Sequence, residues 1–120
     1  MDNKKTILIV DDDEFLSGAI QIVMEEYGHA VSCCNNGLDA VNLSKVQAFD
    51  MILTDYNMPG LTGGVVCRLI RNHRPDAYIV GFSSDSQDQA FIDAGANKFI
   101  YKDTLAQDFS LLHQLVQMTP

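Results

Sequence analysis

Short runs of strand-forming residues set the strongest limit on how this chain can fold. Five such runs, three to five residues long, are separated by stretches in which apolar residues recur every three or four positions. The expected strands are 7–10, 30–34, 51–54, 78–82 and 99–101, and the expected helices are 15–26, 38–46, 63–74, 90–94 and 105–116. This alternation predicts an α/β protein, a (βα)5 doubly wound parallel sheet with right-handed crossovers and helices on both faces.

Length and composition indicate an ordinary acidic domain. The chain has 120 residues, so we expect residues 1–120 to form a single domain. Its 47% hydrophobic and 20% charged residues are typical of a soluble globular protein. The net charge is −8 and the longest basic run is Lys4-Lys5, so a nucleic-acid partner is not expected. An acidic domain can still bind hard cations such as Mg²⁺.

The N-terminus, the cysteines and the histidines exclude other classes. The four strongly apolar residues before Asp11 are too few for a signal peptide or a membrane span, so we expect a cytoplasmic protein with no membrane contact. The three cysteines lack CxxC spacing and are expected to be reduced. The histidines are far apart in the sequence, which argues against an imidazole metal site: His29, His73 and His113.

Polar residues stand at the ends of four expected strands. They are Asp11, Asp12 and Asp13 after the first strand, Asp55 after the third, Ser83 and Ser84 after the fourth, and Lys102 after the fifth. The carboxyl ends of parallel strands share one edge of a sheet, so these side chains can meet there. Any one of them could simply cap its own loop, but the whole set favours a shared site.

The chemistry of this set favours a magnesium and phosphoryl site. Carboxylates within a few ångströms repel one another, and a divalent cation with oxygen ligands relieves that conflict. Such a cation also attracts a phosphoryl group and neutralises its oxygens. Ser83 could donate to a phosphoryl oxygen, and Lys102 could pair with it as a point charge. Asp55 would then be placed as a nucleophile that forms an aspartyl phosphate.

Five segments make a recognisable set: Ile7-Leu8-Ile9-Val10-Asp11-Asp12; Asp55-x-Asn57-Met58-Pro59-Gly60; Gly63; Ser83-Ser84; and Gly95-Ala96 followed by Lys102. Over the whole chain, this set resembles the receiver domain of two-component response regulators. The resemblance implies a flavodoxin-like sheet with strand order 2-1-3-4-5. It also implies that Asp55 is the phosphorylated residue, acting with Lys102 and Ser83.

The same resemblance implies a metal site and a switch. Mg²⁺ would be held by Asp55, by Asp12 directly, by Asp11 through water and by the backbone carbonyl of Asn57. Two further residues match the positions that move when the phosphoryl group arrives: the hydroxyl of Ser83 and the aromatic ring of Phe99. Asn57 and Asp85 match positions that flank the path of the hydrolytic water and tune dephosphorylation.

The function implied is that of a phosphorelay signalling protein. It would accept a phosphoryl group from a histidine kinase or histidine phosphotransfer protein in a Mg²⁺-dependent reaction, and later hydrolyse it, with no other enzymatic activity. With no DNA-binding output domain in the chain, the signal would pass to a protein partner through the fourth helix (90–94), the fifth strand (99–101) and the fifth helix (105–116). The state expected is a monomer or a weak dimer through the same surface.

Three residues depart from the family pattern. Asp103 follows Lys102 where most receivers have a proline, often after a cis bond, so we expect a trans bond and a reshaped loop. Thr62 replaces the usual Asp and can cap the next helix equally well. Phe99 has no hydroxyl, so it cannot make the hydrogen bond of a switch tyrosine.

Other functions would use the same residues differently. The segment Asp11-x-Asp13 also resembles haloacid-dehalogenase phosphatases, with Asp11 as nucleophile, although Phe15 stands where that family has Thr or Val. A flavin-binding module is disfavoured because the Asp11-Asp12-Asp13 carboxylates would repel the cofactor phosphate. A receiver that works unphosphorylated, as a docking module, is the third alternative.

Overall fold

The sheet has the strand order expected from the sequence. The computed structural model describes residues 4–120. All neighbouring strands are parallel, in the order β2-β1-β3-β4-β5. The strands are β1 Thr6–Val10, β2 Ala30–Cys34, β3 Met51–Asp55, β4 Ile79–Ser83 and β5 Lys98–Tyr101. The predicted flavodoxin-like architecture is therefore confirmed, with strand ends within a residue of those expected.

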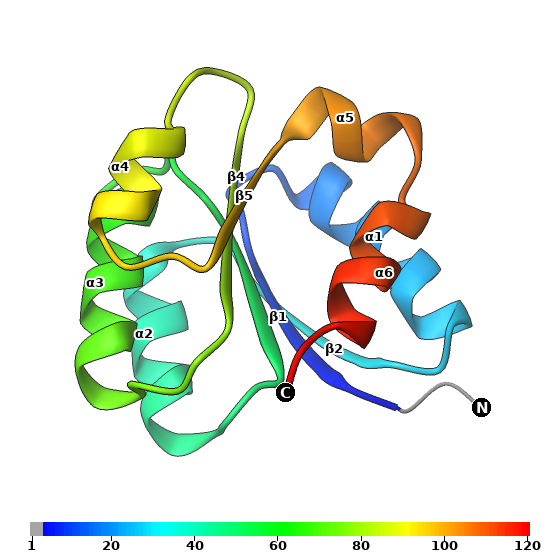
Figure 1. Cartoon of the computed structure of the whole chain (residues 1–120), viewed down its shortest axis with the longest axis horizontal. Coiled ribbons are helices and arrows are strands. Elements are labelled where there is room, and N and C mark those ends of the chain that lie inside the picture. Colours follow the sequence, from blue (N-terminus) through cyan, green and yellow to red (C-terminus); the bar gives the residue numbers. More distant parts are fainter. Residues whose placement is uncertain (1–3) are drawn as a thin grey trace.

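Helices cover both faces of this sheet, as Figure 1 shows. On one face lie α2 Gly37–Val46, α3 Gly63–His73 and α4 Asp88–Asp93; on the other lie α1 Glu14–Glu26, α5 Lys102–Gln107 and α6 Ser110–Gln117. Within the part of the chain that the structure describes, no helix is long and apolar enough to cross a membrane.

Each face of the sheet has its own core, because successive strand residues point to opposite sides. In β1, Leu8 belongs to the core beneath α2, α3 and α4, whereas Ile7 and Ile9 belong to the core beneath α1, α5 and α6. All five residues of β3 and of β4 are buried. The central strands are therefore fixed from both sides, and with them the positions of the residues at their ends.

The prediction of a single last helix over 105–116 was wrong. Two helices, α5 and α6, are separated at Asp108, whose backbone is extended (φ −159°, ψ 96°). The Asp108 carboxylate accepts from the backbone N–H of Ser110 at 3.0 Å and from its hydroxyl at 2.6 Å. These local bonds compete with helix continuation, and the apolar spacing of Leu105, Phe109 and Leu112 gives no sign of the break.

The tertiary structure brings together two histidines that are far apart in the sequence. His29 and His113, 84 positions apart, come together with 3.0 Å between Nε2 of His29 and Nδ1 of His113. The His113 ring stacks on Tyr27 at a centroid distance of 3.8 Å. Among the described residues, the group of acidic, cysteine and histidine side chains arranged to hold a metal ion is a different one, and it contains no histidine.

Candidate functional site

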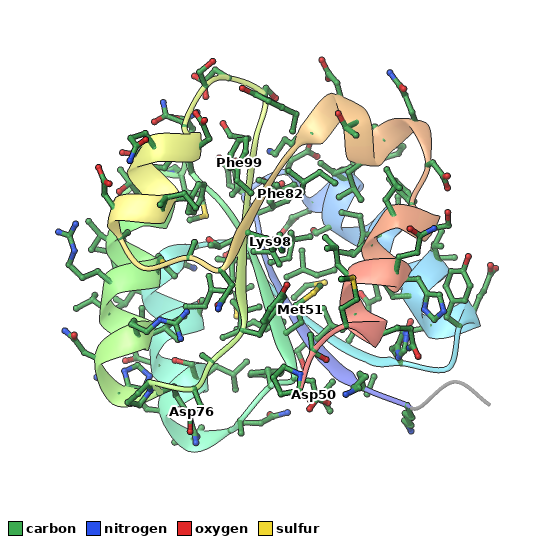
Figure 2. The ribbon with its side chains drawn as sticks, in the orientation of Figure 1. Asp50, Met51, Asp76, Phe82, Lys98 and Phe99 are labelled. Carbon is green, nitrogen blue, oxygen red and sulfur yellow. The ribbon has the colours of Figure 1, made fainter. Side chains whose placement is uncertain are left out.

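The register of the strands brings the predicted residues to one edge of the sheet. Val10 of β1 lies opposite Thr54 of β3, so Asp11 is level with Asp55. Ser83 at the end of β4 lies opposite Tyr101 of β5, so Lys102 follows one position beyond. In Figure 2, Phe82 and Phe99 mark this edge, and Asp50, just before β3, marks the opposite one.

Three carboxylates meet at this edge. Oxygens of Asp11, Asp12 and Asp55 lie within 4.8 Å of one another. Asp11 and Asp55 are 1% and 3% exposed, whereas Asp12 is exposed. Asp13 does not join them, because its Oδ1 accepts from the backbone N–H of Leu16 and caps α1. The structure thus separates one residue of the Asp11-Asp12-Asp13 run from the other two.

Lys102 connects the two buried carboxylates. Its Nζ lies 3.0 Å from Oδ2 of Asp11 and 3.2 Å from Oδ1 of Asp55. Desolvation lowers the pKa of Lys102, but pairing with Asp11 and then with Asp55 outweighs it, so the net pKa is raised and the ammonium stays charged. The peptide bond after Lys102 is trans, as expected, and Lys102 is itself the first residue of α5.

One supporting residue was missed by the sequence reasoning. The ring of Phe82, the penultimate residue of β4, lies with its centroid 5.0 Å from Nζ of Lys102. A cation placed over an aromatic face is attracted by the ring's quadrupole. Phe82 is fully buried, so its ring is fixed beside the Lys102 ammonium. The sequence signal that could have indicated this role is the position of Phe82 directly before Ser83 at the strand end.

The buried carboxylate of Asp11 is suited to binding a second cation in addition to the Lys102 ammonium. Burial is the main cause that raises its pKa to about 6, opposed by hydrogen bonds from Asp13 and Lys102, with the charge of Asp55 adding to the rise. Apart from its ion pair with Lys102, Oδ2 of Asp11 has no hydrogen-bond partner among the described residues. Oxygen-only ligands with one exposed member, Asp12, fit Mg²⁺, which retains several waters.

The loop after β3 is shaped by two glycines and a cap. Gly60 has a positive φ of 80°, which glycine adopts without steric cost. A Cβ at Gly63 would overlap the backbone carbonyl of Asp55, so only glycine lets α3 begin this close to Asp55. Thr62 caps α3 by accepting from Val65, as predicted. Asn57 lies exposed in the same loop.

Ser83 is completely buried, and its hydroxyl donates to Oδ1 of Asp85 at 2.6 Å. The pKa of Asp85 is lowered, first by this hydrogen bond and, among smaller causes, by those from Gln87 and Asn57. Asn57 and Asp85, both assigned to the path of hydrolytic water, thus lie near each other. Ser84, the second serine at this strand end, is exposed.

Phe99 is part of a series of aromatic contacts. Its ring meets Phe91 at a centroid distance of 5.9 Å and Tyr101 edge-on at 5.0 Å, while Phe91 meets Tyr56, next to Asp55, at 5.5 Å. Phe91 is fully buried, Phe99 is half-buried and Tyr101 is 42% exposed. The series therefore runs from the residue after Asp55 to the surface over β5.

Comparison with known proteins agrees with this geometry. A family model of the response regulator receiver domain matches residues 7–116. Transcriptional regulatory protein CseB of Streptomyces coelicolor is 31% identical over 104 residues, covering 85% of this chain and 44% of that protein. The sensor kinase/phosphatase CqsS of Vibrio cholerae is 29% identical over 106 residues, covering 83% and 16%. The chain spans less than half the length of these curated relatives.

Solved structures share the fold. The receiver domain of sensor histidine kinase PA1611 from Pseudomonas aeruginosa, determined with magnesium in its active-site cleft, is 23% identical, with a TM-score of 0.86 over 96% of each chain. Response regulator TrrA of Thermotoga maritima, determined with Mg²⁺ and BeF, is 24% identical, with a TM-score of 0.81 over 93% of this chain and 98% of that one. The family match favours a receiver over the phosphatase and flavin alternatives, and the chain belongs to the response regulator receiver domain family of two-component signalling systems.

Proposed function

We propose that this receiver domain accepts a phosphoryl group on Asp55 from a histidine kinase or histidine phosphotransfer protein. A carboxylate oxygen of Asp55 attacks the phosphorus of a phosphohistidine, and a P–O bond forms as the P–N bond breaks. The electron pair of the P–N bond stays on the nitrogen, and the ring, which carries a proton on its other nitrogen, leaves as neutral imidazole. The observation that carries the proposal is the pairing of two buried carboxylates, Asp55 and Asp11, with the one ammonium of Lys102.

The residues that would hold Mg²⁺ are Asp11, Asp12, Asp55 and the backbone carbonyl of Asn57. The proximity of the three carboxylates and the buried Oδ2 of Asp11 support this assignment. When bound, Mg²⁺ supplies neutralisation of the phosphoryl oxygens. Lys102 exchanges its contact with Asp55 for one with the phosphoryl group, and Ser83 donates its hydroxyl to another phosphoryl oxygen.

The phosphoryl group is lost by hydrolysis of the aspartyl phosphate. Water attacks the phosphorus, the P–O bond to Asp55 breaks, and inorganic phosphate leaves. Asn57 and Asp85 flank the water, which is supported by the mutual proximity of these two side chains. A receiver is a signalling domain rather than a conventional enzyme, and we propose that self-phosphorylation from a small phosphodonor and this hydrolysis are its only activities.

Output is proposed to pass through the surface of α4, β5 and the last two helices, α5 and α6, which stand in place of the single fifth helix predicted from the sequence. Ile92 on α4 is 50% exposed and Tyr101 on β5 is 42% exposed, which supports a protein-binding role for this surface. Phe99, which contacts Tyr101, is the proposed switch aromatic together with the Ser83 hydroxyl. A downstream protein, or a second copy in a weak dimer, would bind there; nucleic acid and membrane are not proposed partners.

The proposal extends to the domain and its location. We propose that residues 1–120 form one receiver domain, supported by the family match over 7–116 and by one continuous sheet. The cytoplasm is the proposed location, because histidine kinases present their phosphorylated histidine there.

Intact-mass spectrometry tests the proposed function. The protein is incubated with Mg²⁺ and acetyl phosphate, alongside Asp55→Asn and Asp11→Asn. We expect an added mass of about 80 Da that requires Mg²⁺ and disappears in Asp55→Asn. An adduct that survives in Asp55→Asn would place the phosphoryl group elsewhere. No adduct in the wild type would favour the unphosphorylated docking module.

A further inference from the structure

The hydroxyl of Ser83 already has an acceptor in this structure. Besides donating to Oδ1 of Asp85 at 2.6 Å, Oγ of Ser83 receives the backbone N–H of Asp85 at 3.3 Å. Ser83 is buried at the end of β4, whereas Asp85 is exposed in the loop before α4. A buried hydroxyl is therefore held by a carboxylate that lies in solvent.

This acceptor competes with a phosphoryl group. A serine hydroxyl has one proton and donates to one acceptor at a time. Ionised carboxylates are strong acceptors, and hydrogen bonding from Ser83 is the main cause that holds the pKa of Asp85 below its usual value. The switch step of the proposed function needs the same proton for a phosphoryl oxygen. Ser83 must therefore leave Asp85 before it can bind the phosphoryl group.

We propose that Asp85 is a positioning residue that holds Ser83 in the unphosphorylated arrangement and so opposes its contact with the phosphoryl group. This inference rests on the proposed roles of Asp55 and Ser83. Water can solvate the exposed Asp85 carboxylate once the bond opens, so the opposition is moderate. Removing Asp85 should increase affinity for a phosphoryl mimic about three- to tenfold, the range expected for the net contribution of one typical hydrogen bond.

The experiment measures binding of beryllium trifluoride with Mg²⁺, followed by ¹⁹F NMR. This anion bonds to a carboxylate oxygen with the shape of a phosphoryl group, and it is not hydrolysed. Its affinity is therefore independent of any effect of Asp85 on dephosphorylation. Asp85→Ala should bind the mimic more tightly than the wild type, and Asp85→Asn, which keeps a neutral acceptor, should lie between them.

A double-mutant cycle with Ser83→Ala isolates the hydrogen bond from the charge. In the Ser83→Ala background, Asp85→Ala should change the affinity by less than about 1.5-fold, because there is no hydroxyl to release. Asp88→Ala removes one negative charge from the first turn of α4 and is the matched control, expected to behave as the wild type. Thermal unfolding of each variant verifies that it is folded.

The outcomes separate this inference from the function on which it rests. If Asp85→Ala gains the same affinity with and without Ser83, the effect is electrostatic and Asp85 does not act through Ser83. If Asp85→Ala leaves the affinity unchanged, the inference is equally wrong, while binding that still depends on Asp55 leaves the proposed function standing. If the mimic binds equally well to Asp55→Asn, the proposed function fails, and this inference fails with it.

Discussion

The proposed acceptor, Asp55, and the proposed switch residue, Ser83, end neighbouring strands, yet they are supported in different ways. Asp55 is paired with Lys102, and the helix after it, α3, has eleven residues, four of them buried, and the Thr62 cap. Ser83 is bonded to an exposed loop residue. The helix after it, α4, has six residues, no side-chain cap, and Phe91 as its one buried residue.

This difference fits two halves of a signalling reaction. Phosphoryl transfer needs groups held in a fixed geometry, which the buried acceptor side supplies. A switch needs an element whose alternative arrangements differ little in free energy, which a short and weakly anchored helix supplies. Among the contacts that hold α4 in place are the Phe91 ring against Gly81 and, just after the helix, hydrogen bonds from Arg71 to the carbonyl of Gly95.

The largest effect on stability should come from replacing a glycine with alanine, either beside Asp55 and α3 or beside Ser83 and α4. A Cβ at Gly63 would overlap the Asp55 backbone, whereas a Cβ at Gly81 would overlap the ring of Phe91. The backbone of β3 at Asp55 cannot move aside, whereas the short helix α4 that carries Phe91 can shift. Gly63→Ala should therefore lower the free energy of unfolding by about 3 kcal/mol, and Gly81→Ala by about 1–2 kcal/mol. Urea denaturation measures both.

Gly64→Ala is the control for this pair. The nearest atom to its new Cβ is at the edge of the Tyr56 ring, 3.3 Å away. Alanine also has a higher helix propensity than glycine. It should therefore be no less stable than the wild type. A greater loss at Gly81 than at Gly63 would reverse the comparison and make α4 the rigid side.

The next effect concerns the contact between α3 and the turn before β5. Arg71 donates to the carbonyls of Gly95 and Pro75 and to the side chain of Asn97. Arg71→Ala should cost about 2 kcal/mol, since hydrogen bonds from a charged group are lost. In Arg71→Ala, amide hydrogen exchange should accelerate more in α4 than in α3, relative to the wild type.

Arg68→Ala is the matched control, because Arg68 is exposed one turn earlier on the same helix. It should change stability by no more than about 0.5 kcal/mol. Equal effects of the two substitutions would show that Arg71 does not anchor α4.

The acceptor side should respond to pH through Asp11. With its pKa raised to about 6, Asp11 is about one-tenth ionised at pH 5, so Mg²⁺ should bind about tenfold more weakly there than at pH 7.5, or about 1.4 kcal/mol. Calorimetric titration measures this affinity. A flat profile between pH 5 and 7.5 would mean that Asp11 is ionised throughout that range.

Stability without metal should change in the opposite sense. The folded state binds the Asp11 proton more tightly than the unfolded state, so this group stabilises the fold at low pH, and that contribution is lost as pH rises through about 6. Asp11→Asn, which cannot ionise, should therefore be more stable than the wild type at pH 7, and the difference should close by pH 4. A constant difference would exclude this linkage.

The smallest effect should come from the cap of α3, which α4 lacks. Thr62→Ala removes the acceptor for the N–H of Val65 and should cost about 1 kcal/mol in thermal unfolding. Thr62→Ser keeps the hydroxyl and should restore nearly all of it. If both substitutions have the same effect, the contribution of Thr62 is not capping.

Most of the fold could be predicted from the sequence, because its signals are local. Apolar runs marked the strands to within a residue, and Gly28 and Gly95, both with positive φ, marked the ends of two helices. The break at Asp108 could not be predicted, because the apolar spacing continues across it while the competing bonds to Ser110 are polar. Such a choice depends on small differences between local hydrogen bonds.

For the site, the sequence by itself determined which residues stand at the strand ends, since the end of an apolar run is a local property. Only the tertiary structure decided how they are used. Asp13 turns to cap α1 while Asp11 turns into the site, and Ser83 bonds to Asp85. Phe82 lies beside Lys102. Each of these outcomes depends on which partner lies within about 3–5 Å in space, and side-chain hydrogen bonds and cation–π contacts act only over such distances.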